Sequence, residues 1–209
     1  MAMNKKNGLK VWLRASLAGV ARVRLGTWFY WPVEPATSVP QLPAAFELNE
    51  RVFNVGHTFD VQSGDTTYGK VEEKWFRFTK TLFYTDNDGK LVAYARKAFI
   101  SFGTRIDVFD GNGVYIGSLQ KQVFSSLLKV TTTYSVLDAK GYEIASCQKT
   151  SIITTDMQLQ DIAGNHVAEL YRPLSLVGDS WLLKVHKAGA IDSRLLVMIG
   201  PFKTMADSK

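Results

Sequence analysis

The first 33 residues hold the side chains best suited to binding an anionic surface. This segment contains no Asp or Glu but six basic residues and three tryptophans: Lys5, Lys6, Lys10, Trp12, Arg14, Arg22, Arg24, Trp28 and Trp31. The whole chain has a formal net charge of +6, so residues 34–209 balance to zero. Cationic side chains attract lipid phosphates, and tryptophan favours the boundary between water and lipid. The segment therefore predicts contact with an anionic phospholipid membrane.

The apolar residues of this segment recur at helical spacing. Leu9, Leu13, Leu17 and Val20 fall on one side of a helix, together with Trp12 and Val23, while the basic residues from Lys10 to Arg24 fall broadly opposite. A basic amphipathic helix is typical of peripheral membrane binding, in which each cation contributes on the order of 1 kcal/mol. Other interpretations are that the segment packs on its own domain, docks on a partner protein, serves as a cleavable targeting sequence, or binds nucleic acid. We favour the membrane or a protein partner.

A second set of basic residues recurs along the chain. Each lies eight residues after a glycine that occupies the same place in a repeated turn motif: Lys97, Lys121, Lys149 and Arg172. Equivalent strand positions could form a basic stripe around one rim and bind phosphates or lipid headgroups. The alternative is that each cation ends a strand in solvent and guards against aggregation.

Other chemistries are not indicated. His57, His166 and His186 have no metal-ligand spacing with one another or with Cys147. The chain lacks a nucleophile elbow, a phosphate loop and a paired-carboxylate motif. The Asp and Asn residues near positions 86–88 and 110–112 lie in loops too short for a calcium site. We therefore expect a non-enzymatic protein without a metal or cofactor.

The repeated motif itself indicates the architecture. The pattern Asp-x-x-Gly-x-x-(Val/Ile)-(Ala/Gly)-x-x-x-(Lys/Arg) starts at Asp86, Asp110, Asp138 and Asp161, at intervals of 24, 28 and 23 residues. Asp at the first turn position bonds the turn backbone, and Gly at the fourth supplies a positive φ. A motif of this kind at a nearly constant period predicts a repeated β-hairpin.

The residues after each turn predict strands that close into a barrel. A large and a small residue alternate there, so that one face packs a core and the other lies close to a neighbour: Val92-Ala93, Ile116-Gly117, Ile144-Ala145 and Val167-Ala168. A degenerate fifth copy around Ser63-Gly64-Asp65 and further extended runs bring the total to about twelve strands. An antiparallel sheet of that size is expected to curl and close.

Three segments are expected along the chain. Residues 1–31 form the basic arm, residues 32–45 form a connector with four prolines, and residues 46–209 form the barrel domain. The apolar stretch near residues 192–204 predicts a helix without a polar face, which must be enclosed by the barrel. We expect Gly200-Pro201 to end or kink this helix, and residues 203–209 to form a polar tail.

The hairpins and the final helix together resemble the LURP-one-related proteins. These share the tubby-like fold with tubby proteins and phospholipid scramblases, and the resemblance covers residues 46–202. The segment from Ala190 to Gly200 is similar to the scramblase C-terminal segment. The resemblance implies a closed barrel of about twelve strands around a central hydrophobic helix. Scramblases carry an acidic calcium-binding cluster before this helix, where this chain has only Asp179 and Asp192, so no metal is expected.

The sequence thus predicts a mainly β, tubby-like barrel that binds phospholipid at a membrane surface through its basic arm. The alternative is a protein-interaction or structural module whose arm docks on another chain. The single Cys147 cannot form an internal disulfide, and no window of about 20 residues is apolar enough to span a bilayer. We therefore expect a cytoplasmic protein that can associate peripherally with a membrane.

Overall fold

The computed structural model describes most of the chain after the N-terminal segment. The described residues are 23–24, 30–31, 33–51, 56–76, 79–98, 103–125, 130–149, 156–172 and 180–207. Within the arm, β1 (Val23–Arg24) pairs with β2 (Tyr30–Trp31) in an antiparallel bridge. Val23 and Arg24 are thus in a strand, and the rest of the expected amphipathic helix lies outside the described residues.

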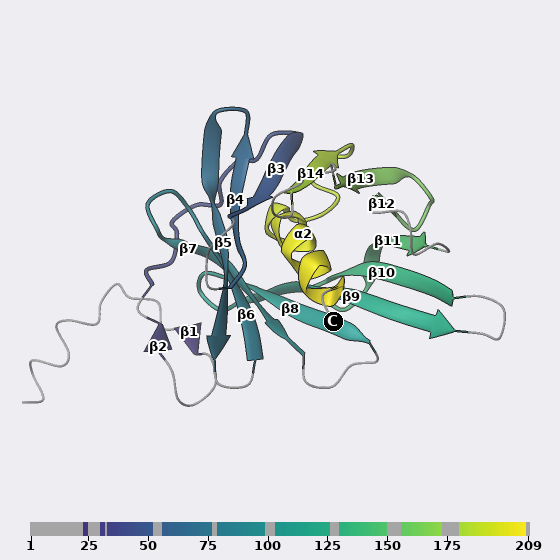
Figure 1. Ribbon diagram of the computed structural model, residues 1–209, viewed down its shortest axis with the longest axis horizontal. Helices are drawn as coiled ribbons and strands as arrows, with labels where there is room; N and C mark the ends of the chain where they lie inside the picture. Colours follow the sequence, from purple (N-terminus) through teal and green to yellow (C-terminus); the bar gives the residue numbers. More distant parts are fainter. Residues whose placement is uncertain are drawn as a thin grey trace, which may run out of the picture.

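Twelve antiparallel strands form a closed barrel, which confirms the prediction of a mainly β protein with a closed barrel of about twelve strands (Figure 1). The order around the wall is β10-β11-β12-β13-β14-β3-β4-β5-β6-β7-β8-β9, and β9 pairs with β10. The first and last strands of the domain are therefore neighbours, with Phe46 opposite Leu183. The strands are β3 (Ala45–Glu50), β4 (Thr58–Ser63), β5 (Thr66–Phe76), β6 (Thr79–Thr85), β7 (Leu91–Lys97), β8 (Thr104–Asp110), β9 (Tyr115–Ser125), β10 (Val130–Asp138), β11 (Glu143–Lys149), β12 (Met157–Gln160), β13 (His166–Tyr171) and β14 (Ser180–Val185).

The four Asp-x-x-Gly motifs form the turns that the sequence predicts. In the first, Oδ1 of Asp86 accepts hydrogen bonds from the amides of Asp88 (3.0 Å) and Lys90 (2.8 Å). Gly89 has a φ of 77°, and its amide donates to the carbonyl of Asp86 at 3.0 Å. Asp110, Asp138 and Asp161 make the same bonds to their own turns. The turns join successive strands and gather at one end of the barrel.

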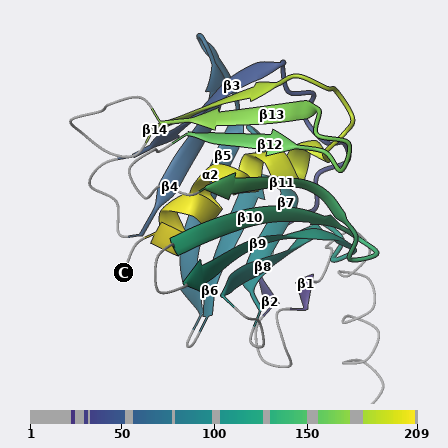
Figure 2. The same ribbon diagram turned by 90° about the vertical axis from the view of Figure 1, so that its right-hand side faces the viewer.

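Among the described residues there is one helix, α2 (Ser193–Asp207), and it runs through the barrel (Figures 1 and 2). Leu195 to Ile199 are each at most 4% exposed, so the helix is buried on all sides as its composition predicts. Ala93, Ala145 and Ala168, the small residues of three of the pairs, lie in the same core, and Gly117 of the fourth pair is also buried. At Gly117, a Cβ atom would lie 3.1 Å from Cδ1 of Leu195 and 2.3 Å from the carbonyl oxygen of Leu137.

The sequence predicts the helix near residues 192–204, with an end or a kink at Gly200-Pro201; it does not end there, because α2 continues through Pro201 to Asp207. Lys203 and Thr204 are buried, so these residues do not begin a polar tail. Proline removes one backbone donor, but the barrel wall holds the following turn in place. Nε1 of Trp181, on β14, donates a hydrogen bond of 3.1 Å to the hydroxyl of Thr204. Tertiary contacts therefore extend the helix beyond its local sequence signal.

Hydrogen bonds hold the start of the connector, residues 34–36, against the outside of the barrel. The amide of Ala36 donates to the carbonyl of Leu91 at 2.8 Å, and the amide of Leu91 donates to the carbonyl of Glu34 at 2.8 Å. Val33 packs against an outer cluster of Phe83, Leu91 and Tyr94. Both views place β1 and β2 outside the wall, near β6 and β8 (Figures 1 and 2).

Candidate phosphate-binding end of the barrel

Strand direction brings the repeated basic residues to one end of the barrel. Neighbouring strands are antiparallel, so β7, β9, β11 and β13 all run away from the Asp-x-x-Gly turns. Lys97 and Lys149 end β7 and β11, Arg172 follows β13, and Lys121 on β9 pairs with Thr104 at the start of β8. We call this end the basic end and the opposite end the turn end. For Lys149 only the backbone position is described.

Lys121 is directed to the C-terminus of α2. Its Nζ atom donates a hydrogen bond of 3.0 Å to the carbonyl oxygen of Ala206, in the last turn of the helix. The last carbonyls of a helix have no partner within the helix and carry partial negative charge. The lysine therefore stabilises the helix terminus, and the same contact holds its ammonium group at the basic end.

Two aromatic rings connect Lys121 with two further cations. Nζ of Lys121 lies 5.8 Å from the centre of the Tyr134 ring, and Nζ of Lys203 lies 5.2 Å from the same centre. Lys203 also lies 5.6 Å from the Trp181 ring, over which the guanidinium of Arg172 lies at 5.3 Å. Cations at these distances are attracted to the faces of aromatic rings. The structure thus brings Lys121 and Arg172 together through the two rings.

Lys203 is the member of this group that the sequence analysis missed. It is only 6% exposed, and it enters the group because α2 continues past Pro201. The sequence signal that could have found Lys203 was its spacing from Gly200. Lys203 follows that buried glycine by three residues and therefore lies one helical turn further along α2. Lys97, in contrast, is exposed at the end of β7. Lys97 lies on the same face of β7 as Ala93 and Ala95, whose side chains belong to the core.

Acidic residues occupy another part of the basic end. The side chain of Glu73 on β5 is 1% exposed, and Nζ of Lys80 lies 2.9 Å from its Oε1 atom. Nε2 of His57 lies 3.7 Å from Oε2 of Glu73, and Nδ1 of the same ring contacts Glu50. A buried carboxylate requires such cationic and hydrogen-bonding neighbours. In this part of the barrel end the cationic side chain thus already faces a carboxylate, and the basic character belongs to the part formed by β7, β9 and β13.

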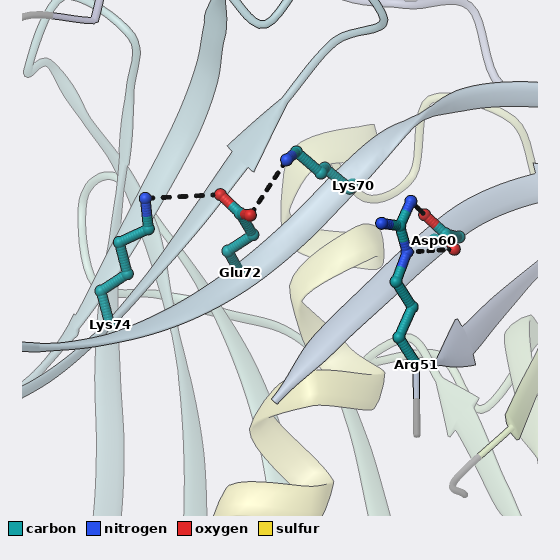
Figure 3. A network of polar contacts seen from close by, with 5 residues as sticks. All are labelled: Arg51, Asp60, Lys70, Glu72 and Lys74. Atoms are coloured by element: carbon teal, nitrogen blue, oxygen red, sulfur yellow. Dashed lines mark hydrogen bonds and ion pairs between the residues drawn. The ribbon is translucent and has the colours of Figure 1, made fainter. Parts of the chain in front are cut away.

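Charges on the outer wall of β4 and β5 also neutralise one another (Figure 3). Glu72 lies between Lys70 and Lys74, with nitrogen–oxygen distances of 2.9 and 3.5 Å, and Arg51 pairs with Asp60 at 2.7 Å. Burial alone would raise the pKa of Glu72, but the two lysines together bring it below its ordinary value. This face of the wall therefore does not form a basic patch.

The remaining predicted site residues belong to the N-terminal arm. Arg24 lies in β1 and Trp31 lies in β2, where Val23 pairs with Trp31. The other arm residues lie outside the described part of the chain: Lys5, Lys6, Lys10, Trp12, Arg14, Arg22 and Trp28. Of the arm, the structure therefore describes β1 and β2, which lie beside the barrel.

Among the described residues, no group of three or more His, Cys, Asp or Glu side chains has an arrangement that could hold a metal ion. In the same residues, no helix has the length and apolar character needed to cross a bilayer. In comparisons with known proteins, no family model matches the chain, and no curated protein matches it.

Proposed function

We propose that this protein is a non-enzymatic phospholipid-binding module that associates with anionic membrane surfaces. The arm and the basic end of the barrel would make the contact. The observation that carries the proposal is the separation of charge along the barrel. The repeated cations lie at the basic end, whereas the first aspartate of every repeat lies at the turn end. Anionic headgroups attract the first end and repel the second.

The arm supports the same orientation. Residues 1–33 contribute six cations without an acidic residue, so they account for the whole net charge of the chain. Figure 1 places β1 and β2 outside the wall, on the lower side of the barrel, where β5 ends. We propose that the arm and the basic end face one surface together. The resemblance to LURP-one-related and scramblase-like proteins is compatible with a lipid ligand.

A vesicle flotation assay tests this proposal. Full-length protein would be mixed with phosphatidylcholine vesicles, with or without phosphatidylserine, across a salt series. We expect recovery only with the anionic lipid, and a decline as salt screens the attraction. A variant with Lys5, Lys6, Lys10 and Arg14 changed to Gln should float poorly, while Lys140→Gln at the turn end serves as the control. Equal recovery of the arm variant and the wild type would remove the proposal.

The second candidate is a protein-interaction module. It is supported by the packing of Val33, next to the arm, against the outer cluster of Phe83, Leu91 and Tyr94 of the barrel. Such docking depends on apolar contact more than on charge, so salt should weaken it little. Vesicle-independent complex formation that resists salt would favour this candidate.

A further inference from the structure

A cavity of about 430 Å³ opens at the turn end, beside the start of α2. Val39, Leu42 and Pro43 of the connector form one side of it. The remaining wall includes Phe46 at the start of β3, Val185 at the end of β14, and Ile191 and Leu196 around the start of α2. Small-molecule sites commonly occupy about 300–1,000 Å³ and are lined mainly by apolar side chains. The volume and lining of this open pocket lie within that description.

A second, more polar cavity adjoins the first. It has a volume of about 190 Å³ and shares Val39 and Arg194 with the larger cavity. Its other lining residues include Thr37 and Ser38 of the connector and Asn112 of a turn. Hydroxyl and amide side chains both donate and accept hydrogen bonds. The two cavities together thus present an apolar chamber next to a hydrogen-bonding chamber.

The charged side chains where the two cavities meet determine which kind of polar group can bind there. Arg194 is held by Asp192, with its Nε 2.9 Å from Oδ1 and its Nη2 2.7 Å from Oδ2. Asp110 lines the smaller cavity as a second carboxylate, and its Oδ1 accepts two turn amides. One guanidinium therefore faces two carboxylates, and its own charge is already paired. An anionic ligand would gain little here, whereas an uncharged group with hydroxyls would find donors and acceptors.

We propose that the turn end binds a single-chain amphiphile with an uncharged, hydroxyl-bearing head. The apolar chain occupies the larger cavity, and the head lies in the smaller cavity near Thr37, Ser38 and Asn112. Arg194 stands between the two parts with its charge neutralised by Asp192. This site is at the opposite end of the barrel from the repeated cations. It is therefore independent of the proposed membrane contact, and either can fail without the other.

Calorimetric titration of full-length protein with 1-decanoylglycerol, below its aggregation concentration, tests the inference. We expect saturable one-to-one binding, and binding of decanoate that is roughly tenfold weaker because its head is anionic. Ala188→Trp would place an indole in the wall of the larger cavity and should weaken binding roughly tenfold or more. Ala163→Trp is the matched control, since Ala163 is also exposed at the turn end but lies outside both cavity linings.

A second variant tests the head separately from the chain. Ser38→Ala at an exposed connector position should reduce the preference for 1-decanoylglycerol over 1-decanol and leave folding intact. Absence of saturable binding to the wild type would overturn the proposal. Unchanged affinity in a folded Ala188→Trp protein would also overturn it. Binding that appears only after residues 1–31 are removed would show that the arm occupies the cavity, which contradicts the proposal as well.

Discussion

The ammonium group of Lys121 lies 3.0 Å from the carbonyl oxygen of Ala206, so a wall strand is bonded to the end of the enclosed helix. The sequence predicts either a headgroup rim or a solvated strand end for Lys121. The structure describes a third role, in which the lysine caps α2 inside the barrel end. Lys97 occupies the equivalent repeat position but is exposed. Equivalent residues of the repeat therefore differ in what they stabilise.

Replacing Lys121 should lower the stability of the fold. We expect Lys121→Met to reduce the free energy of unfolding by about 1 kcal/mol, because the last carbonyls of α2 lose a charged donor. Lys97→Met is the matched control and should change the free energy by less than about 0.5 kcal/mol, as is usual for exposed positions. Urea unfolding at neutral pH measures both values. Equal effects of the two substitutions would show that the contact with Ala206 contributes no stability.

Lys97 and Lys90, at opposite ends of the barrel, separate stability from membrane binding. Lys97→Glu should reduce flotation with anionic vesicles, since a cation at the basic end is replaced by an anion and each such charge is worth about 1 kcal/mol near the surface. Its unfolding curve should match that of the wild type. Lys90→Glu, at the turn end, makes the same charge change away from the proposed contact and should float normally. Equal recovery of the two variants would show that the barrel end does not face the lipid.

Gly200 allows α2 to approach the barrel wall closely. A Cβ atom at this position would lie 2.7 Å from Cδ1 of Leu48 and 3.2 Å from the Trp181 ring. Gly200→Ala should therefore destabilise the protein by about 1–3 kcal/mol, the usual cost of overpacking a core, although alanine is the better helix former. Denaturant unfolding of the single and double variants with Leu48→Ala tests the cause. If the two costs simply add, the contact with Leu48 is not the source of the loss.

Much of the fold could be predicted because its signals are local. Each turn needs an aspartate to bond its amides and a glycine with positive φ, and both requirements are visible within four residues. The four hairpins with this turn and the degenerate fifth contain too many strands for an open sheet. The sequence therefore also predicts that the barrel closes. The apolar segment at residues 195–199 has no polar face, which leaves only an enclosed position for its helix.

The errors occurred where distant residues decide the structure. Pro201 is a local signal for a helix end, but Trp181 on β14 bonds Thr204 and holds the next turn. The burial of Lys203 follows from that continuation, and its spacing of three residues from Gly200 indicates it only once the helix is known to pass Pro201. The cavity at the turn end is likewise formed by the connector, β3, β14 and α2, which are far apart in the sequence. A local motif search cannot detect a site of that kind.

The start of α2 should make stability depend on pH in acid. Asp192 accepts a hydrogen bond from the amide of Arg194 at 2.9 Å and thus caps the helix. Burial alone would raise the pKa of Asp192, but the bonds and attraction from Arg194 bring it below its ordinary value. A carboxylate with a lowered pKa stabilises the folded state above its unfolded pKa of about 3.9, and this stabilisation is lost as the pH falls through the folded value.

Asp192→Asn tests this dependence, because asparagine keeps the capping geometry and removes the charge. We expect the variant to be less stable than the wild type at neutral pH, and the difference to shrink once the pH falls below about 4. Asp65→Asn, at an exposed turn position, is the control and should show little difference at any pH. Urea unfolding across a pH series measures both differences. A gap between the wild type and Asp192→Asn that stays constant into acid would show that the charge of Asp192 does not stabilise the start of α2.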